Sequence, residues 1–449
     1  MNRKLSFFLS SLLVVTVVSC THQAGRHHGQ SGLAGAILSS PARAELNQFK
    51  PVPAPAPKTL LLKKGDRLAI CGDSITEQKM YSRIMETYLT VCTPDLEIAT
   101  RQFGWSGEKA DGFLARMTND VLRFEPNVAT TCYGMNDHQY RPYEEAIGER
   151  YRRYMTAIVE SFKAHKVDVV LGSPGCVGKK PSWSKDTNAT SLALNKNLLE
   201  LRNIGLEVAR SETVRFADVF WPMLKGGYEA QATYGTNFNI AGKDGVHPDW
   251  SGQLVMAYAF LKAFGLDGDL GSITFDLKSN SAQATGGHSV VSANHGAVEL
   301  RSSRYPFCIS NTNLTTDNSI RAGMSLVPFT EDLNRFHFRI KNGSGSRYKV
   351  TWGKESKTFS AAQLKAGINL AEEFPINPFA EAFSKVDKAV AAKQAYETKQ
   401  IKQVFRSAEA KADMEGTAAK TERERAVLVA AIKDAFVPVT HTISVESEQ

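Results

Sequence analysis

The sequence has no long hydrophobic run after its first twenty residues, so no later segment has the length and composition of a membrane-spanning helix. It also lacks a concentrated basic stretch. The 54 Lys and Arg residues exceed the 46 Asp and Glu residues to give a net charge of +8, but they are spread along the chain. A nucleic-acid partner is therefore not expected, because such proteins gather positive charge on one stripe or face.

Cysteine is scarce, and its placement indicates neither a metal site nor a disulfide framework. No Cys-x-x-Cys or His-x-x-x-His pair occurs, so the sequence predicts no metal and no other cofactor. The six cysteines have no spacing that implies defined disulfide pairs. Cys71 and Cys132 lie inside apolar runs and are expected to be buried thiols.

The N-terminus has the pattern of an export signal. Two basic residues precede an apolar stretch of signal-peptide length, residues 5–18, and Val17-Val-Ser-Cys20 resembles a bacterial lipobox. We expect residues 1–20 to be a lipoprotein-type signal peptide with Cys20 as the lipid attachment site. The protein would then lie outside the cytoplasm, anchored in the periplasm or at the outer membrane. An ordinary secretory signal cut nearby is the alternative. The proline-rich stretch 21–59 predicts a tether.

Residues 60–270 alternate between short apolar runs and helical patterns, which predicts an α/β domain. Such alternation is typical of a parallel sheet covered by helices on both faces. The runs of strand length fall at residues 68–71, 98–103, 128–133, 167–171 and 214–220. The helical patterns fall at residues 79–90, 110–124, 143–164, 192–209 and 251–264.

Two long connections interrupt this pattern, at residues 172–190 and 222–243. Long loops at strand ends are usually functional or mobile, and we expect the second to form a substrate-facing wall. Several aromatic residues could line a sugar-binding surface, although packing is their commoner role. They are Trp105, Trp183, Tyr228 and Tyr234.

Residues 271–449 differ in character from the α/β domain. Residues 271–360 contain short alternating runs bounded by Gly, Asn and Ser, which predict a β-rich module of antiparallel strands. Residues 361–449 predict a helical region. Ser360-Ala-Ala-Gln363 fits a helix capping box, and residues 379–405 and 411–436 predict two long helices that pair with each other.

Ser74 is the first candidate for chemistry. It follows the apolar run at residues 68–71 through a sharp Gly72-Asp73 turn and precedes a helical stretch. A hydroxyl at the carboxyl end of a strand, near a helix N-terminus, is exposed and faces backbone N–H groups, which suits a nucleophile. The alternative is that Ser74 only caps the helix.

The segment Asp244-Gly-Val-His247-Pro could supply the base for such a nucleophile. On a tight turn the Asp244 carboxylate can reach the far ring nitrogen of His247 and hold its tautomer. Asp-Gly and His-Pro also favour an ordinary turn, which is the alternative. Asp73 and Asp137 are expected to fix their own turns, and His138 is a weaker catalytic candidate.

Two more residues could bind a developing negative charge. Gly107 in Gly104-Trp-Ser-Gly107 follows the second apolar run, and a glycine lets a backbone N–H approach a substrate. Asn136 in Tyr133-Gly-Met-Asn-Asp137 follows the third run and can donate from its amide. Both could instead be ordinary turn residues at strand ends.

Taken together and in their order along the chain, with Ser74 first, then Gly107, Asn136 and the Asp244–His247 pair, these four stretches resemble the blocks of the SGNH hydrolases, the GDSL-like esterase and acylhydrolase superfamily. The resemblance covers roughly residues 65–266. It implies a flavodoxin-like three-layer α/β/α sandwich with a parallel five-stranded sheet. It also implies a catalytic set of Ser74, Asp244 and His247, with an oxyanion hole made by Ser74, Gly107 and Asn136.

We therefore expect an extracytoplasmic serine esterase that removes short acyl groups, such as acetyl, from carbohydrates. Its substrate would be a small-molecule or polysaccharide ester. Two alternatives stay open: a lipase or lysophospholipase-type acylhydrolase, and an inactive binding protein of the same fold held by a lipid at Cys20.

Overall fold

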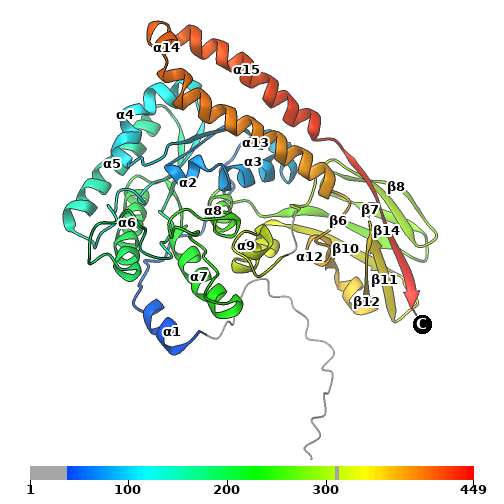
Figure 1. Cartoon of the computed structure of the whole chain (residues 1–449). Coiled ribbons are helices and arrows are strands. Elements are labelled where there is room, and N and C mark those ends of the chain that lie inside the picture. The colour runs from blue at the N-terminus through cyan, green and yellow to red at the C-terminus, as the bar shows by residue number, and fades with distance from the viewer. Residues whose placement is uncertain (1–37, 309–312, 449) are drawn as a thin grey trace, which may run out of the picture. The chain divides into compact units, whose positions relative to one another are not determined.

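The computed structural model describes residues 38–308 and 313–448 (Figure 1). The predicted signal peptide, Cys20 and the first part of the predicted tether lie outside these residues. Among the helices of these described residues, none is long and apolar enough to cross a membrane.

As predicted, the α/β domain is built on a sheet of five parallel strands. They lie in the order β2-β1-β3-β4-β5. The strands are β1 Arg67–Gly72, β2 Ala99–Gly104, β3 Val128–Cys132, β4 Asp168–Gly172 and β5 Arg215–Ala217. Successive residues of β1 point to opposite faces, so Leu68 and Ile70 enter one core while Ala69 and Cys71 enter the other. Both faces are apolar because helices cover both.

Helices on the two faces complete the three-layer sandwich. They are α3 Tyr81–Val91, α4 Ala110–Asp120, α5 Glu145–Ala164, α6 Ser191–Ser211 and α8 Trp250–Ala263. Helices α3 and α8 pack on one face, where Tyr81 stacks on Phe260. Helices α4 and α5 cover the other face, where Phe113 contacts Phe162. Shorter helical turns lie in the connections between these strands and helices: α2 Ser74–Glu77, η1 Pro94–Leu96 and η2 Leu122–Phe124.

The prediction of a long loop at residues 222–243 is wrong over most of its length, because α7 spans Phe220–Tyr234. Pro222 lies in the first turn of α7, where its missing N–H breaks no helical hydrogen bond. The neighbouring glycines serve close packing. A Cβ on Gly227 would lie 2.7 Å from the side chain of Ile240.

The prediction of a free tether is also wrong for its described part. Residues 40–46 form helix α1, Ser40–Leu46. Phe49 is buried and lies 6.3 Å from Phe220, ring centre to ring centre. Arg202 of α6 donates a hydrogen bond to the Val52 carbonyl at 2.5 Å. The proline-rich segment therefore docks on the α/β domain, because its apolar residues find a core to enter.

The β-rich module contains two sheets, in the orders β13-β10-β6-β7 and β12-β11-β14-β9-β8. Its strands are β6 Asp269–Asp276, β7 Ser281–Ala284, β8 His288–Asn294, β9 Ala297–Ser302, β10 Arg335–Lys341, β11 Arg347–Trp352, β12 Glu355–Ser360, β13 Ile368–Asn369 and β14 Val439–Glu448. Its short helices are α9 Ile320–Leu326, α10 Phe329–Leu333, α11 Ala361–Ala366 and α12 Leu370–Glu373. The capping box at Ser360 and Gln363 is confirmed. One pairing departs from the antiparallel expectation, since β6 and β10 run parallel.

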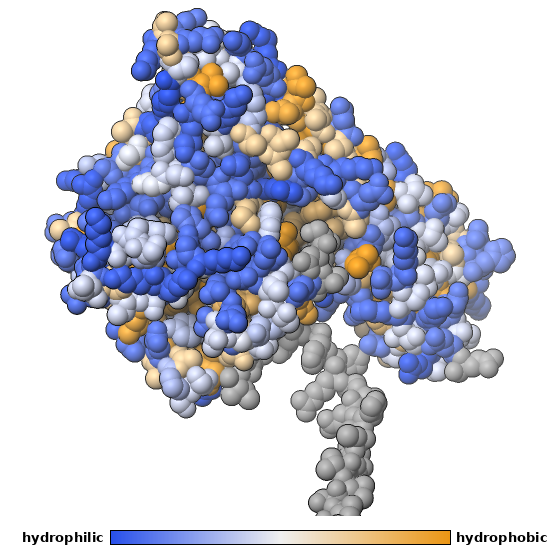
Figure 2. All heavy atoms as spheres, in the orientation of Figure 1, coloured by the Kyte–Doolittle hydropathy of each residue, from blue (hydrophilic) through white to orange (hydrophobic). Residues whose placement is uncertain are grey.

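The C-terminal region is helical only in part. Its helices are α13 Ala380–Lys402, η3 Val404–Arg406, α14 Ala408–Ala412 and α15 Met414–Ala435. Helices α13 and α15 pack side by side, as predicted (Figure 1). The chain then ends in β14, which pairs with β11 on one side and β9 on the other. Alternate residues of β14, His441, Ile443 and Val445, are buried, so the period of its apolar pattern is that of a strand. The face drawn in Figure 2 is mostly hydrophilic, with apolar groups in separate patches.

Candidate active site

Ser74, His247 and Asp244 form a continuous hydrogen-bonded row at the carboxyl end of β1. The Ser74 hydroxyl lies 2.8 Å from Nε2 of His247, and Nδ1 of His247 lies 2.7 Å from Oδ2 of Asp244. Ser74 is not the cap of α2. Asp73 is, because its Oδ1 accepts the backbone N–H of Ile75 at 3.0 Å. The Ser74 hydroxyl is thus left to meet the imidazole.

The turn before α8 orients the imidazole. Oδ1 of Asp244 accepts the backbone N–H groups of Val246 and His247, both at 2.9 Å, while Oδ2 faces the ring. Gly245 has φ +86°, a conformation that favours glycine, and a Cβ there would lie 2.6 Å from the Lys179 carbonyl. The Asp244 carboxylate therefore sets the tautomer with hydrogen on Nδ1 and leaves Nε2 free to accept the Ser74 proton.

The Asp244 carboxyl is held in its charged form. Partial burial raises its pKa, but hydrogen bonds from the backbone and ring of His247 and from the backbone of Val246 outweigh that effect and keep the pKa below its usual value. An ionised carboxylate at this position stabilises an imidazolium when His247 takes up a proton.

Gly107 and Asn136 lie on the turns that follow β2 and β3. Gly107 has φ +74°, which favours glycine, and a Cβ there would meet no atom within 4 Å, so open space lies beside it. Asn136 is oriented from both ends of its amide. Its Nδ2 donates to the Glu108 carbonyl at 3.0 Å, and its Oδ1 accepts the Tyr140 hydroxyl at 3.0 Å. The second Nδ2 hydrogen is left for another acceptor.

The Gly107 loop is braced from inside the domain by Glu108. Its carboxylate accepts two bonds from the Arg116 guanidinium, at 2.6 and 2.7 Å, and one from the Tyr133 hydroxyl at 2.8 Å. The backbone N–H of Trp105 donates to the Gly72 carbonyl at 3.0 Å, which ties the loop to the end of β1. Glu108, Arg116 and Tyr140 could not be predicted from the sequence, because nothing in their local pattern marks them.

The two other aspartates fix turns, as predicted. Asp137 accepts the backbone N–H groups of Ala110 and Gly134, both at 3.0 Å. Burial raises the pKa of Asp137 to about 6 and that of Asp73 to about 7. His138 is fully buried, bonds through Nδ1 to the Met135 carbonyl, and has a pKa lowered by burial to about 4. It makes no contact with the Ser74 row in the described structure.

Of the four aromatic residues considered for substrate contact, Trp183 lies beside the triad formed by Ser74, His247 and Asp244. It is 43% exposed, and its ring lies 6.1 Å from His247 and 5.6 Å from Tyr140. Tyr228 instead bonds to Glu45 of α1, and Tyr234 contacts Ser325 of α9. The expectation that residues 222–243 form a substrate-facing wall is therefore wrong for their aromatic side chains, because α7 turns these residues toward α1 and α9.

Within residues 38–308 and 313–448, no three His, Cys, Asp or Glu side chains converge as metal ligands. The five cysteines of that part of the chain are free and buried. Burial raises the pKa of the Cys71 and Cys132 thiols, which keeps them protonated. The predicted burial of Cys71 and Cys132 is confirmed.

Comparisons with known proteins match part of this chain to a family. Residues 70–255 match the model of the GDSL-like lipase/acylhydrolase family. A comparison with curated proteins gave no match. Among solved structures, BT4096, described as a gut microbial diltiazem-metabolizing enzyme, is similar with a TM-score of 0.70 and 22% identity. The match covers 88% of this chain and all of that one, so the fold is shared across most of the sequence, including much of the region beyond the α/β domain.

Two smaller proteins each match a little under half of this chain. The acetylxylan esterase Axe2 from Geobacillus stearothermophilus has a TM-score of 0.38 and 20% identity, and the match covers 46% of this chain and 97% of that one. LAE5, an alpha/beta hydrolase from the metagenome of Lake Arreo, has a TM-score of 0.36 and 20% identity, with 46% and 98% covered.

The family match spans all five candidate residues, from Ser74 to His247. Residues 70–255 thus form a domain of the GDSL-like lipase/acylhydrolase family, and the chain is a hydrolase that acts on ester bonds.

Proposed function

We propose that Ser74 is the nucleophile of this ester hydrolase, with His247 as general base and Asp244 as the group that orients it. The row of 2.8 and 2.7 Å contacts from Ser74 to Asp244 carries this proposal. His247 takes the Ser74 proton as the hydroxyl oxygen attacks the ester carbonyl. The protonated ring then passes that proton to the departing alcohol, and a water molecule repeats the cycle on the acyl-enzyme.

The tetrahedral intermediate carries a negative oxygen that needs donors. The Ser74 N–H, the Gly107 N–H and the free Nδ2 hydrogen of Asn136 supply three. Each comes from a turn at the carboxyl end of a neighbouring strand, so the donors are in place before the substrate arrives. Losing one donor of this kind typically costs about 3 kcal/mol in the transition state.

The substrate that we propose is a short acyl ester of a carbohydrate. Trp183 supports this choice, because its exposed indole stands beside His247 and Tyr140 and offers a flat apolar face to a sugar ring. A long acyl chain would instead need a continuous aliphatic lining. Among the described residues, Trp183 is the one exposed large apolar side chain with a contact to the triad.

Chain-length dependence tests the substrate. Purified protein is assayed on 4-nitrophenyl esters from acetyl to decanoyl, and acetate release is then measured from acetylated xylan and acetylated pectin. We expect kcat/KM to be highest for acetyl, and Trp183→Ala to raise KM for the glycan more than for the aryl ester. Values of kcat/KM that climb with chain length, with no acetate released from either glycan, would favour the lipase alternative.

We also propose that the protein works outside the cytoplasm, held by a lipid on Cys20. The charged start, apolar stretch and lipobox-like Val17–Cys20 support this location. Cys20→Ser is expected to release the protein from the membrane fraction or to block its processing. A mature protein that starts elsewhere and is equally soluble in both variants would contradict the anchor.

A further inference from the structure

The loop that carries Gly107 is held by a residue near the far end of the chain. Glu77, the last residue of α2, accepts the Ser106 backbone N–H at 2.5 Å and the Ser106 hydroxyl at 2.6 Å. The same carboxylate accepts two bonds from the Lys402 ammonium, both at 2.8 Å. Lys402 is the last residue of α13. The contacts thus run from the C-terminal helices to the residue before Gly107.

A second contact from the same helices reaches the other side of this loop. The Trp105 ring has three cations within 5.2 Å of its centre: Arg116 of α4, Lys402, and Arg406 of η3. Cations over an indole face are attracted by the ring quadrupole. Two of these three cations come from the C-terminal region, so Trp105 contacts that region directly, whereas Ser106 is linked to it through Glu77.

The ion pair between Glu77 and Lys402 is partly shielded from water. The Glu77 side chain is 20% exposed and that of Lys402 is 26% exposed, so salt screens the pair less than a surface pair. Burial raises the pKa of Glu77, but the bonds from Lys402 and Ser106 outweigh it and keep the pKa below its usual value. Glu77 therefore stays ionised and can accept from both partners.

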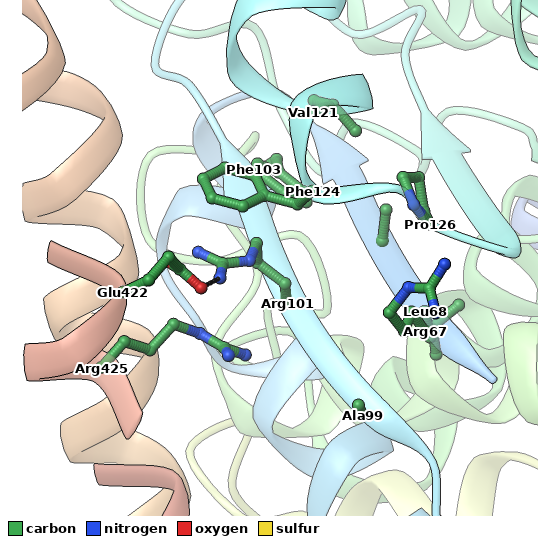
Figure 3. A pocket seen from close by; sticks show the side chains of 11 residues that line it. Arg67, Leu68, Ala99, Arg101, Phe103, Val121, Phe124, Pro126, Glu422 and Arg425 are labelled. Atoms are coloured by element: carbon green, nitrogen blue, oxygen red, sulfur yellow. Dashed lines mark hydrogen bonds and ion pairs between the residues drawn. The ribbon is translucent and has the colours of Figure 1, made fainter. Parts of the chain in front are cut away.

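Helix α13 is itself fixed to the strand that leads into the loop. Glu397 of α13 accepts the backbone N–H of Gln102 at 3.1 Å, and Lys393 donates to the Thr100 carbonyl at 2.6 Å. Arg101 of β2 reaches Glu422 of α15 at 2.5 Å, as Figure 3 shows. Lys402 therefore extends from an element whose position is set by β2, the same strand that ends at Gly104.

We propose that Lys402 is a positioning residue for the oxyanion hole. Through Glu77 it holds Ser106, and so aims the next backbone N–H, that of Gly107, at the developing oxyanion. This inference rests on the proposed function of Ser74 and Gly107. It makes the C-terminal helices part of the apparatus for ester hydrolysis, in addition to any role in stability.

The test compares Lys402→Met with Lys402→Arg and with Lys399→Met, a matched control at an exposed lysine of the same helix. Each full-length variant is assayed for kcat and KM on 4-nitrophenyl acetate and for inhibition by phenylboronic acid, whose tetrahedral adduct on Ser74 needs the same donors. Melting temperature is measured in parallel. We expect Lys402→Met to lower kcat by about tenfold and to weaken the boronic acid by a similar factor, with KM within about twofold.

Lys402→Arg should recover most of kcat, and Lys399→Met should match the wild type. A purely structural role for Lys402 would change the melting temperature while leaving kcat and boronic acid affinity unchanged, and that outcome would overturn the inference. If Lys402→Met does not fold, Glu77→Gln removes the charge of the other partner in the same ion pair. That variant must then show a lowered kcat with KM within about twofold. A wild type without activity on any ester would instead reject the proposed function, and this inference with it.

Discussion

Ser74 and His247 are 173 positions apart in the chain, yet their side chains meet at 2.8 Å. Each stands on a short turn whose backbone is pinned by an aspartate, Asp73 for α2 and Asp244 for the segment before α8. The positions of the Ser74 and His247 side chains thus depend on two local turns. In each turn, a carboxylate accepts backbone N–H groups that would otherwise lack a partner.

Ser74→Ala is expected to abolish ester hydrolysis and to leave the fold intact. The hydroxyl is the proposed nucleophile, and the Asp73 cap of α2 does not depend on it. We expect kcat on 4-nitrophenyl acetate to fall by at least about 1000-fold. Circular dichroism spectra and melting temperature should match the wild type. Turnover near the wild-type value would contradict the assignment of Ser74.

Asp244→Asn is expected to lower kcat by roughly 100- to 10,000-fold. An asparagine can present its NH2 group to Nδ1 of His247, which favours the tautomer with hydrogen on Nε2 and removes the acceptor for the Ser74 proton. The change is measured as kcat and KM on an aryl acetate. Asp434→Asn, at an exposed position of α15, is the control and should change neither value. Equal rates for the two variants would remove Asp244 from the mechanism.

At the scale of elements, β14 is tied into its sheet by a buried row of polar side chains. Trp352 of β11 donates its indole N–H to Nδ1 of His441 at 3.0 Å. Nε2 of His441 lies 2.9 Å from the Ser302 hydroxyl, which lies 2.7 Å from Nδ1 of His288. Nε2 of His288 ends the row at the Leu270 carbonyl, at 2.8 Å. Since the indole can only donate and the carbonyl can only accept, every bond points the same way and both histidines are neutral.

The row predicts a dependence of stability on pH. Burial lowers the pKa of His288 to about 4 and that of His441 to about 3, so the unfolded chain binds these protons first as the pH falls below about 6.5. Each histidine should then lower the free energy of unfolding by about 1.4 kcal/mol per pH unit between pH 6.5 and 4. His441→Gln keeps a neutral polar group in place and removes one of the two titrating histidines. The free energy of unfolding should then fall less steeply with pH, by about 1.4 kcal/mol per pH unit.

Urea unfolding of the wild type and His441→Gln at several pH values measures the difference. The comparison matters because two aspartates act in the opposite direction. Burial raises the pKa of Asp73 to about 7 and that of Asp137 to about 6, so the native state takes up their protons first and gains stability as the pH falls through that range. Identical slopes in wild type and variant would show that His441 is not neutral in the folded state.

At the scale of the whole molecule, a buried network of charges joins the C-terminal helices to the α/β domain. Lys393 of α13 contacts Glu86 of α3 at 2.9 Å and Glu397 at 2.8 Å, and Arg425 of α15 contacts Glu397 at 2.7 Å. The network covers the outer edge of β2, whose free backbone groups would otherwise invite pairing with another chain. A cavity of about 130 Å³ lies beside β1 and β2 and is bounded on the other side by Glu422 and Arg425 of α15 (Figure 3).

Lys393→Met is expected to lower the free energy of unfolding by roughly 3 to 5 kcal/mol. The variant leaves the carboxylates of Glu86 and Glu397 buried and short of a cation, which costs more than the loss of a surface ion pair. Lys388→Met, at an exposed position of the same helix, is the control and should change the value by less than about 0.5 kcal/mol. The same small change in both variants would show that the network does not stabilise the fold. Guanidinium unfolding measures both.

The sequence predicted most of the α/β domain because its signals are local. The strands β1 and β4 are mostly apolar runs, and the covering helices show periodic patterns, so short windows of residues suffice there. Strand β2 is a weaker signal, because it contains Arg101 and Gln102. The five candidate residues stand on turns at strand ends, where parallel topology brings distant segments together. The errors arose where local signals mislead. Pro222 and two glycines suggested a loop but lie in α7, and the proline-rich segment suggested a free tether but docks through Phe49.

By itself, the sequence determined which residue types stand at the carboxyl ends of the strands, and that an α/β sandwich would hold them. Tertiary structure alone decided how these residues are supported. Glu77 and Lys402 are 325 positions apart, and Trp352 and His441 are 89 apart, so no local pattern announces either contact. A hydrogen bond or an ion pair depends on distance and orientation in space, whereas sequence patterns report only the period and the burial of single elements. Strand β14 joins the middle of a sheet whose first strand begins 151 residues earlier for the same reason, because strand pairing depends on segments far apart in the chain.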